Sequence, residues 1–242
     1  MYDPRTMPLP QGDIDLLKER ELDDMVLQNW EYMWDLLSPQ AKQTITAHYY
    51  GLISLQDKQV GRILDFLDAR NLTQDTIIVY TSDHGEMLGD HLLFQKAKPY
   101  QGSVRVPMFL SGPERYVGKH RRMCQDLVEL RDVMPTLLEL AGAGIPDTVE
   151  GKSMLHPVDR EYIHGEHSLG LDSMHYVVTK NDKYIWYSQT GKELYFDLVQ
   201  DPHESHNAIH EGQYSDRIAY LRRCLIRELA SGLSEEDVGD IL

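Results

Sequence analysis

An acid and an imidazole stand side by side directly after a short apolar run. Residues 76–81 read TIIVYT, and residues 82–86 read SDHGE. The β-branched run predicts a strand buried on both faces of a sheet, and ligands bind beyond the carboxyl ends of strands in open α/β sheets. There, Asp83 and His84 can offer one oxygen and one nitrogen to a divalent cation, while Gly85 permits a close backbone approach. The alternative is a polar turn capped by Asp83.

The ion is left open by these two residues. Calcium, magnesium or manganese suits a site dominated by carboxylates, and zinc suits one that gains further imidazoles. Downstream, Lys96, Lys98 and Arg105 bring positive charge. A single cation beside a metal can neutralise an oxyanion or stabilise charge on a leaving oxygen. The alternative is a solvated basic loop.

The elements that must position these residues follow from periodicity. Residues 14–36 have a charged, helical pattern, and a longer helix is predicted over 39–69, ending at Arg70. Its apolar positions recur at helical spacing on one side; they are Leu52, Leu55, Val60, Ile63, Leu64 and Leu67. Residues 106–110, VPMFL, predict a second short strand.

A further helix is predicted after Asp132. This aspartate suits the N-cap, and Pro135 falls in the first turn, where proline is tolerated. The predicted helix ends at Gly142. We expect it to bury Val133, Leu137, Leu138 and Ala141.

The last third of the chain has a different pattern. HYVVT, KYIWYS and ELYFDL are short β-type runs separated by turn residues, which predicts an antiparallel meander. An amphipathic helix is predicted over 214–229. The first 150 or so residues are therefore typical of an α/β domain, and the remainder of a small α+β subdomain.

Composition excludes several classes. The net charge of -15 argues against a nucleic-acid partner, because phosphate contacts need Lys and Arg. The apolar runs are too short to span a membrane. Cys124 and Cys224 are too few for a disulfide framework. The first residues have no signal-peptide core, so the compartment is unknown; the chain as it stands suits the cytoplasm, and a longer form suits the periplasm or secretion.

Five ordered blocks resemble the C-terminal part of the sulfatase family, which belongs to the alkaline phosphatase superfamily. The family patterns are Y-x-x-x-I-x-x-x-D-x-x-V-G-R-I-L, T-S-D-N/H-G-E with G-x-H, G-K-x-x-x-Y/F-E-x-S-x-R-V-P, D-x-x-P-T-L-L and L-Y-D-L-x-x-D-P-x-E-x-x-N. They are similar to Tyr49–Leu67, Thr76–His91, Gln95–Pro107, Asp132–Leu138 and Glu193–Asn207. The resemblance implies an α/β fold, with a partial alkaline-phosphatase-like mixed sheet flanked by helices. It also implies a catalytic portion at 1–155 and a small C-terminal antiparallel α+β subdomain at 156–242.

The same resemblance implies roles for three residues. Asp83 and His84 match the two metal ligands at the strand end, and calcium is the expected ion, with manganese or zinc as alternatives. Lys96 matches the lysine on the sulfate or leaving oxygen, because it stands four residues before Tyr100. Many sulfatases have Asn where His84 stands, and His is also seen in phosphonate and phosphate ester hydrolases of the superfamily. Gln95 replaces the usual Gly.

The family's nucleophile is a formylglycine made from Cys or Ser in C/S-x-P/A-x-R near the N-terminus. Neither Cys124 nor Cys224 matches this pattern, and the N-terminal Asp ligands, the second Lys and a sulfate-binding His are also missing. The resemblance therefore implies a truncated sulfuric ester hydrolase acting on an aryl or saccharide sulfate, inactive alone. The alternatives are a phosphonate or phosphodiester hydrolase, or a non-catalytic degenerate domain.

A second group of candidates lies in the C-terminal part. The segment HGEH contains His164 and His167. It lies where the family's subdomain often faces the mouth of the active site. These histidines are candidates for substrate binding or a second metal, against the simpler alternative of a structural pair.

Overall fold

The computed structural model describes residues 1–11, 36–96, 98–118, 123–167 and 173–230. The predicted helical segment 14–36 lies outside them, apart from its last residue. The chain forms two compact units, one of residues 1–96 and 102–124, the other of residues 97–101 and 125–242. Compact units are not family domains, so the division at residue 155 stays a prediction. Among the described residues, no helix combines the length and apolar character needed to cross a bilayer.

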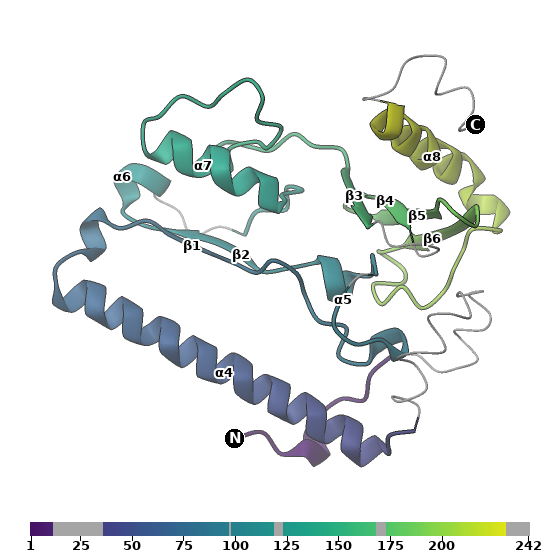
Figure 1. Cartoon of the computed structure of the whole chain (residues 1–242), viewed down its shortest axis with the longest axis horizontal. Coiled ribbons are helices and arrows are strands. Elements are labelled where there is room, and N and C mark those ends of the chain that lie inside the picture. Colours follow the sequence, from purple (N-terminus) through teal and green to yellow (C-terminus); the bar gives the residue numbers. More distant parts are fainter. Residues whose placement is uncertain (12–35, 97, 119–122, 168–172, 231–242) are drawn as a thin grey trace. The chain divides into compact units, whose positions relative to one another are not determined.

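The first unit contains the long helix α4, Pro39–Ala69, which confirms the predicted bounds (Figure 1). Ser38 caps it by accepting a hydrogen bond from the backbone N–H of Ala41 at 3.2 Å, and Pro39 occupies the first turn. A short 3-10 turn, η1 (Pro4–Thr6), contacts the helix. The expected apolar stripe is largely exposed: Leu52, Leu55, Ile63 and Leu64 are all more than 40% accessible.

Two short strands form the sheet of this unit. Strand β1, Ile78–Thr81, pairs antiparallel with β2, Met108–Ser111, so that Ile78 faces Ser111 and Thr81 faces Met108. The expectation of a strand buried on both faces was wrong, since every residue of β1 is only half-buried. Among the described residues only β2 pairs with β1. The shorter helical elements are η3 (Thr73–Asp75), η4 (Asp90–Leu92), α5 (Gln101–Val104) and α6 (Glu114–Val117).

In the second unit, η5 (Leu130–Asp132) leads into helix α7, Val133–Leu140. Asp132 lies at the predicted boundary, but its side chain does not cap α7; it accepts from the backbone N–H of Glu129 instead. The predicted buried face of α7 was also wrong. Pro135 and Thr136 are buried, whereas Leu137 is 44% exposed. The reason is that the chain near Met154 packs on the polar side of the helix, where the Thr136 hydroxyl accepts a hydrogen bond from the backbone N–H of Met154.

The predicted meander is confirmed, with one more strand than expected. Strands β3 (Ile163–His167), β4 (Met174–Val178), β5 (Asp182–Tyr187) and β6 (Lys192–Asp197) form an antiparallel sheet in chain order. After η7 (Gly212–Tyr214), helix α8 (Ser215–Ala230) lies across one face of this sheet (Figure 1). The core between the sheet and α8 is formed by alternate residues of the strands and by one face of the helix. It contains Val177, Tyr184, Tyr195, Ile218, Leu221 and Leu225.

Candidate functional site

Asp83 and His84 lie just beyond the carboxyl end of β1. The hydroxyl of Ser82 donates to the carbonyl oxygen of His84 at 2.7 Å, and the His84 N–H donates to Oδ1 of Asp83 at 3.0 Å. These local bonds hold the bend that follows β1. The predicted pair is therefore positioned by its own backbone.

The structure brings Lys96 to this pair. Its Nζ lies 2.8 Å from Nε2 of His84, and Nδ1 of His84 lies 2.8 Å from the carbonyl oxygen of Gly85. An ammonium can only donate, so Nε2 is the acceptor and Nδ1 carries the hydrogen that Gly85 accepts. The Nε2 lone pair of His84 therefore faces the Lys96 ammonium.

The carboxylate of Asp83 remains open to solvent, with 83% of its side chain exposed. Its pKa is lowered: desolvation acts to raise it, but the electrostatic effect of the neighbouring His84 ring, backbone N–H donors and Lys96 together outweigh that effect. Oδ2 of Asp83 lies 3.6 Å from Nε2 of His84. That separation is one that a single cation spans when each bond is about 2.1–2.6 Å.

Glu86, which the sequence argument did not single out, holds the strand-end loop together. Its Oε1 accepts from the backbone N–H of Gln95 at 2.6 Å and of Leu88 at 3.1 Å. The backbone of Met87 also donates to Gln95 at 2.9 Å. These bonds fix the residue that precedes Lys96. The sequence signal for this role was the carboxylate of Glu86, two residues after the candidate ligand His84.

Gly85 is required for close packing of backbone. Its N–H donates to the carbonyl oxygen of Ser103 at 2.7 Å, and a Cβ at this position would lie 2.1 Å from the carbonyl oxygen of Gly102. The close approach is therefore to the backbone of α5. The segment after Lys96 behaves differently: Lys98 is buried, with its Nζ 5.9 Å from the ring centre of Tyr187.

The two histidines predicted in the C-terminal part are not brought together. His164 and His167 are three positions apart on β3, so their side chains point to opposite faces of the sheet. His164 lies instead with Glu166 and with His175 of β4, a residue that the sequence argument passed over. The pKa of His175 is lowered, chiefly by desolvation and with a contribution from His164, against the opposing charge of Glu166.

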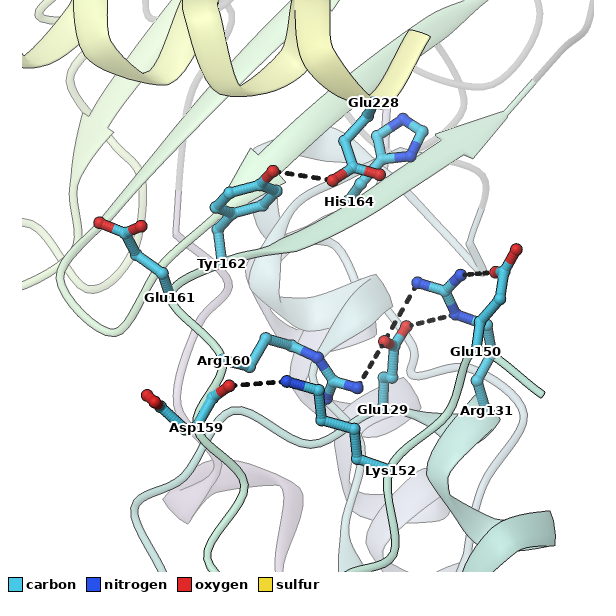
Figure 2. Close-up of a pocket in the computed structure, with 10 residues that line it drawn as sticks. All are labelled: Glu129, Arg131, Glu150, Lys152, Asp159, Arg160, Glu161, Tyr162, His164 and Glu228. Atoms are coloured by element: carbon cyan, nitrogen blue, oxygen red, sulfur yellow. Dashed lines mark hydrogen bonds and ion pairs between the residues drawn. The ribbon is translucent and has the colours of Figure 1, made fainter. Parts of the chain in front are cut away.

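A polar pocket of about 360 Å³ borders His164 (Figure 2). Its basic side chains are already engaged: Arg160 bonds to Asp132, Arg131 pairs with Glu129, and Lys152 donates to a backbone carbonyl. The sequence did not predict this pocket, because its charged residues are scattered over about a hundred positions. With its charges paired, it is a poor site for a free anion.

The comparisons with known proteins agree with one another. The sulfatase family model matches residues 15–143, and the model of the N-sulphoglucosamine sulphohydrolase C-terminal region matches residues 89–231. The chain belongs to the sulfatase family. An arylsulfatase of Clostridium perfringens is 42% identical over 240 residues, which is 91% of this chain and 50% of that protein. This sulfatase chain therefore spans about half the length of that relative.

Two further proteins are similar to this chain. The multifunctional alkaline phosphatase superfamily protein PehA of Trinickia caryophylli is 33% identical over 216 residues, covering 79% of this chain and 41% of PehA. The phosphonate monoester hydrolase of Agrobacterium radiobacter superposes with a TM-score of 0.81 at 22% identity, over 96% of this sulfatase chain and 53% of that one. The second likeness establishes the α/β fold that the sequence predicted.

One segment of this chain does fit the spacing of the formylglycine pattern. Residues 111–115 read SGPER, a match missed above because only the cysteines were considered. Ser111 pairs with Ile78, at the opposite end of the two-stranded sheet from Asp83. Arg115 is bound to Asp75 at 2.6 Å. The segment is therefore not part of the strand-end site.

Proposed function

We propose that this chain supplies the metal-binding and lysine-bearing part of a sulfuric ester hydrolase of the arylsulfatase type. The observation that carries the proposal is the convergence of Asp83, His84 and Lys96 beyond β1. Cleavage of a sulfate ester leaves charge on an alkoxide or phenoxide oxygen. Such a reaction needs positive charge beside the sulfate oxygens and beside the leaving oxygen.

Asp83 and His84 are the residues that would hold the cation. Their donor atoms are near enough for one ion, and calcium is the ion we propose, with manganese or zinc as alternatives. When bound, the ion supplies Lewis-acid stabilisation of the sulfate. Calcium takes six to eight oxygen ligands, so we expect most of its ligands to come from the part of the relatives' length that this chain does not span.

Lys96 would act on the leaving oxygen. The single lone pair of Nε2 of His84 cannot serve both a metal ion and the Lys96 ammonium. Cation binding at His84 would therefore free an ammonium that lies on an exposed residue. A donor placed on developing negative charge contributes about 100- to 1000-fold to turnover.

We expect little or no turnover from this chain alone. The formylglycine nucleophile of the family would come from the remaining half, since Ser111 lies at the wrong end of the sheet. Aryl sulfates and saccharide sulfates are the proposed substrates. The match to the N-sulphoglucosamine sulphohydrolase model supports the saccharide class.

A chimera tests the proposal. The half of the Clostridium perfringens arylsulfatase that lies outside the match would be joined ahead of residue 1, and hydrolysis of p-nitrophenyl sulfate measured. We expect turnover that falls about 100-fold or more in Lys96→Ala. Ser111→Ala is the matched control and should keep its activity. A folded, active chimera unaffected by Lys96→Ala would refute the role of the lysine.

A phosphonate or phosphodiester hydrolase is the second candidate. It is favoured by His84 and by the 33% identity to PehA. The same chimera, loaded with Mn²⁺ in place of Ca²⁺ and given a phenylphosphonate monoester, distinguishes the two. Faster turnover of the phosphonate than of the sulfate would favour this candidate. A folded, metal-loaded chimera that hydrolyses neither would support a non-catalytic domain.

A further inference from the structure

The hairpin of β3 and β4 gathers three metal-ligating residues outside the strand-end site. Glu166 of β3 pairs directly with His175 of β4. His164 is two residues before Glu166 on the same strand, so alternation places all three side chains on one face. That face is the one that packs against α8, and Figure 2 shows His164 beside Glu228 of that helix.

The donor atoms of the three side chains converge. One nitrogen from each imidazole and one oxygen from Glu166 all lie within 4.8 Å of one another. The rings of His164 and His175 are stacked, with centroids 5.7 Å apart at 14°, and Trp186 stacks on the other side of His175 at 5.9 Å. Because neighbouring rings fix the orientation of His175, its nitrogen is held toward the cluster.

Two nitrogens of this cluster lack hydrogen bonds. Nε2 of His164 and Nδ1 of His175 are shielded from solvent and have no hydrogen-bond partner among the described residues. Oε2 of Glu166 lies 3.4 Å from Nδ1 of His175. A buried polar atom without a partner is unfavourable by about 1–3 kcal/mol. A shared ligand would satisfy both nitrogens at once.

We propose that His164, Glu166 and His175 form a second metal site, which binds Zn²⁺ and links β3 to β4. Two imidazoles and one carboxylate are a common zinc donor set, and a fourth position remains for water. The site does not depend on the proposed hydrolase function. It differs from Asp83 and His84 in having nitrogen as the majority donor.

The geometry needs only small side-chain movements. Zinc bonds of about 2.0–2.1 Å place neighbouring ligands about 3.4 Å apart, compared with the present limit of 4.8 Å. Glu166 can supply most of this movement, because 64% of its side chain is exposed. The pocket that His164 borders offers a path for the ion.

The test is a zinc titration of the full chain by calorimetry. Asp83→Ala is used as the background, so that the proposed catalytic site cannot supply the signal. We expect one equivalent of Zn²⁺ to bind, and binding to weaken about tenfold or more in His164→Asn and in His175→Asn. His167→Asn is the matched control, because it removes a histidine from the opposite face of the same strand. It should bind zinc as tightly as the background protein.

Further measurements distinguish a loss of metal binding from a loss of the folded structure. Glu166→Gln changes an exposed side chain and should leave the fold intact, as circular dichroism would show, while weakening zinc binding. Co²⁺ in place of zinc should give the visible absorption of a four-coordinate site, and this absorption should be lost in His175→Asn. Equal zinc affinity in the Glu166, His175 and His167 variants, with all of them folded, would overturn the proposal.

Discussion

Nζ of Lys96 lies 2.8 Å from Nε2 of His84, twelve residues earlier in the chain. The two residues were predicted for different tasks, one on the leaving oxygen and one on the metal. In the structure, the Nε2 lone pair of His84 that would bind the metal accepts a hydrogen bond from the Lys96 ammonium. Since an imidazole nitrogen accepts either a proton donor or a metal ion, lysine and metal are competitors for His84. Metal occupancy and the position of the lysine are therefore coupled.

This competition predicts that Lys96→Gln tightens metal binding to the strand-end site. Removal of the ammonium weakens the donor to Nε2 to a neutral amide at most and removes a nearby like charge, so affinity for Mn²⁺ should rise about three- to tenfold. The chimera described above is titrated with Mn²⁺ in a His175→Asn background, which excludes the second site. Lys98→Gln should not change the affinity. Weaker or equal binding in Lys96→Gln would contradict shared use of the lone pair.

The strand-end loop should not tolerate a methyl group at Gly85. A Cβ there would lie 2.1 Å from the carbonyl oxygen of Gly102, which is backbone and has little freedom to move. We expect Gly85→Ala to lower the free energy of unfolding by about 2 kcal/mol or more. Urea denaturation measures this loss.

Gly51→Ala provides the control for Gly85. Gly51 is in the middle of α4, with nothing within 4 Å of its would-be Cβ. Alanine there should raise stability by about 0.5–1 kcal/mol, because it lowers the entropy of the unfolded chain and favours helix. If both substitutions had the same effect, the close approach at Gly85 would not be the cause.

Local sequence patterns predicted the helices and strands of this protein better than they predicted which residues are buried. Helix α4, strands β4–β6 and helix α8 were predicted because hydrophobic periodicity depends only on residues close together in the sequence. Burial was not predictable in the same way. Leu137 is exposed and Thr136 is buried, because what covers a helix is decided by chain far away in the sequence. The same limit hid His175, which joins His164 only through strand pairing.

Motif residues also had roles that pattern alone did not reveal. Asp132 belongs to the D-x-x-P-T-L-L block, yet its buried carboxylate accepts two bonds from Arg160 at 2.7 and 2.8 Å. It also accepts from the backbone N–H groups of Glu129 and Lys152. The sequence indicated that Asp132 matters but not that it ties three segments together.

We therefore expect Asp132→Asn to destabilise the second unit strongly. The amide cannot accept all four hydrogen bonds, and Arg160 loses the more deeply buried of its two counter-charges, keeping only Glu129. Breaking a buried pair in this way costs about 3–5 kcal/mol. Thermal and urea unfolding would measure the loss. Asp147→Asn, at an exposed position, should change stability by no more than about 0.5 kcal/mol, and an equally small effect at Asp132 would disprove its structural role.

A second buried pair can be tested by a double-mutant cycle. Lys183 and Glu204 are almost fully buried, with Nζ and Oε1 2.5 Å apart. Burial lowers the pKa of Lys183, and the charge of Glu204 opposes this. Lys183→Met alone leaves a buried carboxylate, and Glu204→Gln alone leaves a buried ammonium.

Each single substitution should cost about 3–5 kcal/mol, and the double substitution should cost clearly less than their sum. The cycle is measured by urea denaturation at neutral pH. Lys183 also donates to the carbonyl oxygen of Pro99, so some loss should remain in the double variant. Strict additivity would mean that the two charges do not stabilise each other.

We expect the stability of the protein to change at alkaline pH because of the hydroxyl group of Tyr162. It donates to Oε1 of Glu228 at 2.8 Å, and desolvation together with this carboxylate raises the pKa of Tyr162 to about 12. The folded protein thus holds the proton more tightly than the unfolded chain, whose tyrosine titrates near its ordinary value of 10.0. The stabilisation is complete below pH 10 and is lost as the pH rises toward 12.

Tyr162→Phe should therefore cost about 1 kcal/mol at pH 8, and the difference from the original protein should shrink between pH 10 and 12. Urea unfolding of both proteins at a series of pH values measures this difference, in which the titration of all other groups cancels. Glu228→Gln keeps a hydrogen-bond acceptor but removes the negative charge, so the decline should begin at lower pH in that background. A difference that stays constant up to pH 12 would show that the Tyr162 hydroxyl is not held by Glu228, because only a proton retained by the folded state makes the stability depend on pH in this range.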